Sequence, residues 1–247
     1  MSLFKKIFGK KNEPEFSESG APVYRHENSS EGFVPAGGVD HTEEISNHIE
    51  RFIGRVDGVF HELISEHVHL DIHIVKATEE RPYHVLVTSG MSNKPMNVPA
   101  DLKEFAHAEL CLMLPAGWSL EHKDWDDENV YWPIRWLKIV ARLPHEYNTW
   151  IGYGHTIPNG EEAAPFASGT RLGCMLVMPP MNLPEEFEQL QTGDGKTIHF
   201  YILAPLYPEE MVYKMKHGVD ALTELFDEYE IDDVLDPKRP NVLDDEP

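Results

Sequence analysis

The spacing of apolar residues changes near residue 66 from the period of a helix to the period of a strand. Residues such as Ile45, Ile49 and Phe52 recur every three or four positions and predict an opening helix over about residues 42–65. From Leu70 onward apolar and polar residues alternate, which predicts a strand with one buried face. The chain is therefore expected to place a helix before a sheet.

Turn residues divide the remainder into further elements. Strands are predicted at residues 83–88 and 105–114, as an antiparallel meander with the first strand, and then at 149–153, 172–178 and 197–203. One helix is predicted with Pro133 in its first turn and an end near Pro144, and one long helix from Pro208 to about Tyr229. Helices segregated around runs of strands predict an α+β fold with a mixed, largely antiparallel sheet flanked by helices.

The predicted organisation is a single domain with two flanking segments. Residues 1–40 are expected to be a flexible basic N-terminus and linker, 41–231 the domain, and 232–247 an acidic tail. The sequence leaves open whether this tail packs on the domain. Cys111 and Cys174 each lie in an apolar run and are expected to be buried thiols in strands.

The charge of the chain limits its partners. Among 247 residues, 43 are acidic and 21 are basic, which gives a formal net charge of −22. Such a negative field repels phosphate backbones, so nucleic acid is not expected as a partner, whereas a basic protein would be attracted. Met1 to Lys11 combines apolar and lysine residues but is too short to span a membrane, so at most weak membrane contact is predicted there. Without an export signal, the expected location is the cytoplasm.

One alternating set of residues raises the possibility of a metal site. His67, His69, Asp71 and His73 would project to one face of a strand, and zinc prefers such ligands. However, alternate residues of an extended strand lie roughly 6 to 7 Å apart, so four of them span too far for one ion. A metal-dependent enzyme or metal-binding protein built on this strand is therefore the alternative hypothesis.

Catalytic signatures are not found in the sequence. The segment from Ser89 to Ser92 lacks the G-x-S-x-G pattern of a nucleophile elbow, and the glycine pairs at 152–154 and 193–195 lack the remaining residues of a phosphate-binding loop. Trp132 and Trp136 share a helix face and are expected in the core. We therefore predict that the protein is not an enzyme and needs no cofactor.

Several segments, taken in order, resemble the Suppressor of fused domain family. They are RPY at 81–83, LVTSGMS at 86–92, PM at 95–96, AEL at 108–110, LP at 114–115, WP at 132–133, WLK at 136–138, WIG at 150–152, GHTIP at 154–158 and PLYPEE at 205–210. The resemblance extends from about His41 to Val242. It implies a compact domain of the standalone bacterial type that is used for protein binding. It also implies a role as an immunity protein, which neutralises a partner toxin.

The resemblance also suggests a binding site. In animal relatives a peptide adds to the strand that here corresponds to Tyr83–Thr88, so Thr88, Ser89, Gly90, Met91 and Ser92 are nominated as an exposed binding edge. The alternative is that Gly90 only permits a turn with positive φ at the end of a strand. The leading hypothesis is a cytoplasmic bacterial binding module, an immunity protein that neutralises a basic toxin.

Overall fold

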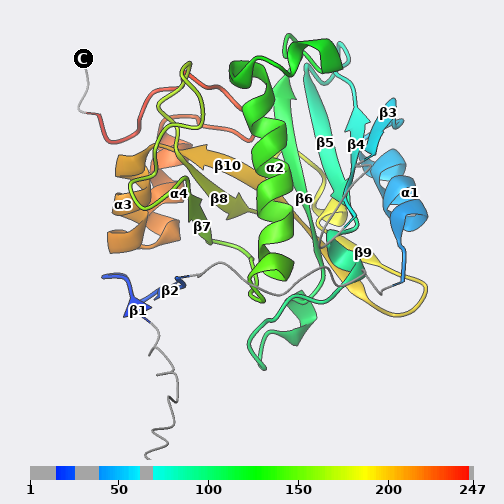
Figure 1. The fold of residues 1–247 in the computed structure, drawn as a ribbon, viewed down its shortest axis with the longest axis horizontal. Helices are drawn as coiled ribbons and strands as arrows, with labels where there is room; N and C mark the ends of the chain where they lie inside the picture. The colour runs from blue at the N-terminus through cyan, green and yellow to red at the C-terminus, as the bar shows by residue number, and fades with distance from the viewer. Residues whose placement is uncertain (1–14, 26–38, 62–68, 245–247) are drawn as a thin grey trace, which may run out of the picture.

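The computed structural model describes residues 15–25, 39–61 and 69–244 and consists of one open sheet with helices on both faces (Figure 1). The sheet has eight strands in the order β3-β4-β5-β6-β10-β8-β7, with β9 paired to β10 beside this path. Their bounds are β3 Gly58–His61, β4 Asp71–Val75, β5 Tyr83–Ser89, β6 Ala108–Pro115, β7 Thr156–Pro158, β8 Cys174–Met178, β9 Gln189–Gln191 and β10 Thr197–Leu206. All neighbouring strands are antiparallel except β6 and β10, which are parallel.

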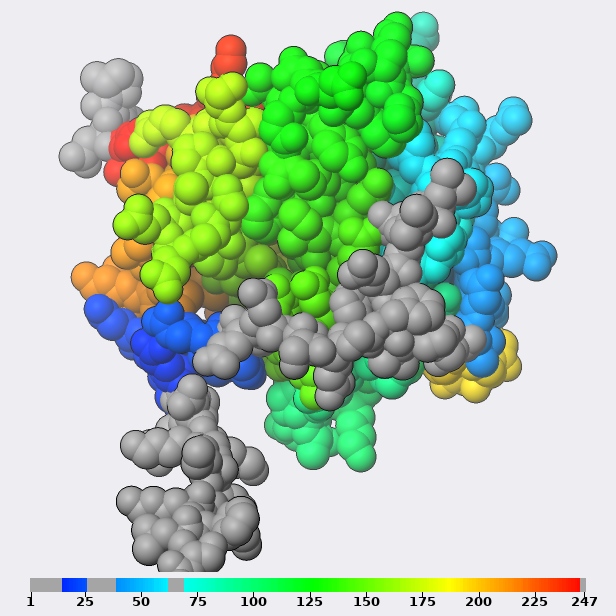
Figure 2. Space-filling view, viewed as in Figure 1, coloured from blue at the N-terminus to red at the C-terminus, as the bar shows by residue number. Residues whose placement is uncertain are grey.

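Four α-helices cover the two faces of the sheet. They are α1 Thr42–Phe52, α2 Glu128–Glu146, α3 Pro208–His217 and α4 Val219–Glu228, and the 3-10 turns are η1 Met91–Asn93, η2 Lys103–Phe105, η3 His122–Asp124 and η4 Glu185–Phe187. Helix α2 buries its apolar side on one face, against Leu86, Leu110 and Leu112. Helices α1, α3 and α4 pack on the other face, against residues such as Val87 and Met113. Figure 2 shows the first face, where α2 (green) lies beside the loop of residues 149–172 (yellow-green).

This architecture confirms the predicted fold class. The structure is an α+β domain with a largely antiparallel sheet, and β4, β5 and β6 form the expected antiparallel meander. Cys111 and Cys174 are buried free thiols in β6 and β8, as expected. Trp132 and Trp136 lie on the buried side of α2, in the core, as their helical spacing predicted.

Two predicted elements, the end of the opening helix and the strand at residues 149–153, are wrong. The opening helix does not extend to residue 65, because α1 ends at Phe52 and Gly54, with a φ of +141°, turns the chain towards β3. Val59 and Phe60, which fit the helical spacing, belong to that strand instead. Residues 149–153 form no strand, and the nearest one is β7 at Thr156–Pro158.

The predicted helix boundaries also need correction. Helix α2 begins five residues before Pro133, at Glu128, because the Asp127 side chain accepts a hydrogen bond from the Asn129 N–H and caps it. Pro133 and Pro144 both lie inside the helix, and each removes one backbone hydrogen bond without ending it. The predicted long C-terminal helix is two helices, because Gly218 has a φ of +95° and separates α3 from α4.

Parts of both predicted flanking segments are ordered against the domain. Residues 15–25 form a hairpin of β1 Glu15–Phe16 and β2 Pro22–Val23, in which Ser19 donates to the carbonyl of Met215. At the other end, Val234 forms a parallel bridge with Met113 of β6, and its neighbours Asp233 and Leu235 are buried. Met1 to Lys11 lies outside the described residues. No helix in the described parts of the chain is long and apolar enough to cross a membrane.

Candidate functional site

The nominated segment Thr88–Ser92 lies inside the domain. Strand β5, which ends at Ser89, is paired with β4 on one side and β6 on the other, and the segment is buried throughout. The expectation of an exposed binding edge is therefore wrong, since the backbone groups of β5 already have partners on both sides. Gly90 has a φ of +107° and turns the chain into η1, as the alternative interpretation proposed. A role of these residues in partner binding stays a prediction.

A buried carboxylate explains why this segment is rich in hydroxyl groups. Glu109 of β6 is fully buried and accepts hydrogen bonds from the hydroxyl of Thr88 at 2.6 Å and from the hydroxyl and N–H of Ser92 at 2.6 and 2.9 Å. Burial, which opposes these hydrogen bonds, raises the pKa of the Glu109 carboxyl above its ordinary value. The arrangement fixes the turn after β5 to the neighbouring strand.

The raised pKa of Glu109 predicts a pH dependence of stability. Because the folded protein holds this proton at a pH where the unfolded chain has lost it, the contribution of Glu109 to stability falls as the pH rises above the ordinary value of 4.5. The unfolding free energy of the native protein minus that of Glu109→Gln should therefore decrease as the pH rises above 4.5, by at most about 1.4 kcal/mol per pH unit. Urea unfolding of both proteins between pH 4.5 and 7 measures this difference. A difference that stays constant with pH would contradict the prediction.

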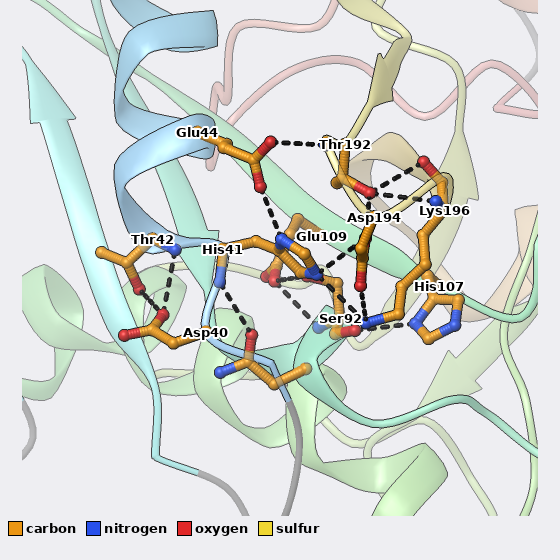
Figure 3. A network of polar contacts seen from close by, with 12 residues as sticks. Asp40, His41, Thr42, Glu44, Ser92, His107, Glu109, Thr192, Asp194 and Lys196 are labelled. Carbon is orange, nitrogen blue, oxygen red and sulfur yellow. Dashed lines mark hydrogen bonds and ion pairs between the residues drawn. The ribbon is translucent and has the colours of Figure 1, made fainter.

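A second cluster of polar side chains links the start of α1 to the hairpin between β9 and β10 (Figure 3). We call His41, Glu44, Asp194 and Lys196 the histidine–lysine cluster. The ring of His41 is buried, with Nδ1 at 2.6 Å from Glu44 Oε2 and Nε2 at 3.1 Å from Lys196 Nζ. Lys196 Nζ is also 2.9 Å from Asp194 Oδ2. The cluster therefore joins two segments that are far apart in the sequence.

The geometry of this cluster has the form of a nucleophile, a base and an orienting carboxylate, but its charges oppose that chemistry. Lys196 would be the nucleophile, His41 the base and Glu44 the orienting group. Asp194, however, is an anion beside the amine: the Thr192 hydroxyl first, and Lys196 next, lower the pKa of its carboxyl to about 2. Lys196 lies in this ion pair as an ammonium, and an ammonium has no lone pair to attack a substrate.

The predicted metal strand does not bring its four residues together. His67 lies outside the described residues, and His73 is buried with its Nε2 at 2.9 Å from Ser89 Oγ. His69 Nε2 lies 3.3 Å from Asp71 Oδ1. His61, which the sequence reasoning missed, lies 3.0 Å from the same oxygen because it is the cross-strand partner of Asp71. Within residues 15–25, 39–61 and 69–244, no group of three or more such side chains could hold a metal ion.

An acidic surface extends from α4 to the segment that follows it. Residues 219–237 contain eight Asp and Glu residues and no Lys, Arg or His. Seven of the eight are exposed, namely Asp220, Glu224, Asp227, Glu228, Glu230, Asp232 and Asp236. None of these seven forms an ion pair with any residue that the structure describes. We refer to these seven residues as the acidic surface.

The fold is that of solved Suppressor of fused proteins. It is similar to a Suppressor of fused homolog from Neisseria gonorrhoeae, with a TM-score of 0.61 and 20% identity over 83% of this chain and 98% of that one. It is also similar to the protein in the Sufu–Fu complex, with a TM-score of 0.55 and 12% identity over 83% of this chain and 93% of that one. A comparison with curated proteins finds no match.

A family model extends this similarity from the fold to the sequence. The model described as Suppressor of fused protein (SUFU) matches residues 66–240, which is more than half of the chain. The chain belongs to the Suppressor of fused family. This finding confirms the resemblance noted in its sequence motifs.

Proposed function

We propose that this chain is a non-enzymatic protein-binding module whose partner presents a basic surface. The observation that carries the proposal is the acidic surface, whose seven exposed carboxylates lack positive partners among the described residues. Membership of a family in which Sufu has been solved in complex with Fu supports a binding role. The exposed carboxylates favour a partner with a basic surface.

Electrostatics gives this surface a specific role in association. The net charge of −22 attracts basic proteins over distances comparable to the Debye length, about 8 Å at physiological salt. Complementary charge of this kind raises the association rate and disfavours acidic competitors. Because the carboxylates of α4 form no ion pair with a described residue, a basic partner can pair with them without breaking an internal ion pair.

A narrower form of the proposal specifies the biological setting. In it the chain is a cytoplasmic bacterial immunity protein that covers the functional surface of a basic toxin. The support for this form is the strong negative charge together with membership of the Suppressor of fused family. It requires no cofactor and no turnover of substrate.

Charge reversal tests the proposal on a purified partner. The tagged protein is used to isolate a basic protein at low salt, and the affinity of the purified pair is then measured by calorimetry. Glu224→Lys combined with Asp227→Lys is expected to weaken binding by about tenfold or more at low salt, because both carboxylates face the partner.

The control changes the charge equally outside the acidic surface. Glu79 and Glu80 are exposed in the turn between β4 and β5, so Glu79→Lys combined with Glu80→Lys should weaken binding much less. Equal loss in both double variants would show that net charge alone governs binding and would contradict the assignment to the acidic surface. If the tagged protein retains no basic protein at low salt, this result would contradict the proposed function itself.

A further inference from the structure

His41 is held by partners of opposite charge on its two ring nitrogens. Nδ1 lies 2.6 Å from Glu44 Oε2, and since a carboxylate only accepts hydrogen bonds, Nδ1 carries the proton. Nε2 lies 3.1 Å from Lys196 Nζ, and since an ammonium only donates, Nε2 must offer its lone pair. The structure therefore fixes His41 as the neutral Nδ1–H tautomer.

A second acceptor lies beside the same nitrogen. Asp194 Oδ1 is 3.6 Å from His41 Nε2, just beyond hydrogen-bond distance. If Nε2 gains a proton, it loses the lone pair that accepts from Lys196 and becomes a donor. Asp194 Oδ1 is then an acceptor at 3.6 Å, while Lys196 Nζ keeps its own contact with Asp194 Oδ2 at 2.9 Å.

We propose that His41 is a proton-linked latch that exchanges Lys196 for Asp194 as the partner of Nε2 and so changes how α1 holds the β9–β10 hairpin. One proton comes from solvent, the hydrogen bond from Lys196 to His41 is lost, and one from His41 to Asp194 forms. The proton from solvent forms an Nε2–H bond on His41, and no bond between heavy atoms changes. The inference is independent of the acidic surface, which lies on other elements.

The hairpin tip is connected directly to this exchange. Glu44, which accepts from His41, also accepts from the backbone N–H of Gly193 at 2.7 Å. Asp194 lies at the tip and Lys196 just after it, so a shift of either side chain is transmitted to residues 193–195. The tip is exposed, which leaves it room to move.

The charges around His41 come from several elements. Asp40 and Glu44 precede and begin α1, Asp194 and Lys196 belong to the hairpin, and His107 lies near enough to interact electrostatically. The uncharged Asn93 of η1 accepts from the backbone N–H of His41 at 3.4 Å. The anions favour a charged His41 imidazole, whereas Lys196 and His107 oppose it. Asp194→Asn tests the effect of an anion, and Lys196→Gln tests the effect of a cation.

The experiment follows the Gly193 amide of the full chain by ¹⁵N NMR between pH 5 and 8, the range in which imidazoles titrate. The native protein should show a step in this resonance, and His41→Gln should not. Lys196→Gln should move the midpoint to higher pH, because a cation that opposes protonation is removed. Asp194→Asn should move it to lower pH, each by about half a unit or more.

The opposite signs of these two shifts separate the latch from a purely structural role. Substitution of the exposed His217, at the end of α3, by Gln should leave the Gly193 titration unchanged. The proposal is overturned if the native protein shows no step, if the step persists in His41→Gln, or if Lys196→Gln and Asp194→Asn shift it in the same direction. If His41→Gln fails to fold, the two hairpin variants still decide the outcome.

Discussion

Replacing Arg239 with alanine should lower the free energy of unfolding by about 3–5 kcal/mol, because it leaves a buried charge without its partner. The guanidinium donates to both carboxylate oxygens of Glu210, at 2.7 and 2.5 Å, and to the carbonyl of Pro205 at 3.0 Å. Glu210 is fully buried, so water cannot replace the lost cation. Urea unfolding followed by tryptophan fluorescence measures the change.

The adjacent residue supplies a matched control for this substitution. Lys238 is exposed, and its side chain forms no ion pair with a described residue, so Lys238→Ala removes a positive charge without touching Glu210. Its effect should stay within about 0.5 kcal/mol. A loss of unfolding free energy below about 1 kcal/mol in Arg239→Ala, which is the range of an exposed ion pair, would contradict the prediction.

Replacing Gly90 with alanine should cost at least about 3 kcal/mol or prevent folding, since backbone strain and overpacking each contribute roughly 1–3 kcal/mol. Gly90 has a φ of +107°, a backbone conformation that residues with a side chain rarely adopt. A Cβ at this position would lie 2.0 Å from the carbonyl oxygen of His69. That oxygen belongs to the backbone leading into β4 and cannot rotate away as a side chain could. Circular dichroism and urea unfolding report the outcome.

Gly117 provides the comparison for Gly90. A Cβ at Gly117 would meet no atom within 4 Å, and its φ is outside the positive region. Gly117→Ala should therefore change stability by no more than about 1 kcal/mol, with a small gain from the reduced freedom of the unfolded chain. If both glycine variants were equally stable, the close approach of Gly90 to His69 would not be a constraint on the fold.

Local patterns predicted the centre of the sheet better than its surroundings. The alternation at Leu70, Ile72 and Ile74 and the apolar run of β6 identify strands because burial selects these residues directly. The ends of the helices were harder to predict from the sequence. The spacing of Val56 and Val59 fits a helix as well as a strand, and only Gly54 and the pairing of β3 with β4 decide between them. Pairing of this kind is a tertiary property that no window of sequence contains.

A candidate site could be predicted from the sequence only where the residues that form it are close together in the chain. The run of carboxylates in residues 219–237 is visible in the sequence, whereas the helical structure that presents part of it is not. Glu109 gave one usable signal, since a carboxylate between Ala108 and Leu110 in an apolar strand requires buried donors. Glu44 is close to His41 in the sequence, but Asp194 and Lys196 lie more than 150 residues away, on the β9–β10 hairpin, so nothing near His41 in the sequence indicates them.

The bridge between Val234 and Met113 has a consequence for biosynthesis. Strand β6 is made early, but its parallel neighbour β10 and the segment that bridges to Met113 are made about a hundred residues later. Contacts so distant in sequence form slowly, since a long loop must close first. Until residue 239 leaves the ribosome, Glu210 has no cation beside it. We therefore expect a nascent chain that has not yet released Arg239 to be less stable than one that has, because the buried Glu210 carboxylate still lacks its ion-pair partner.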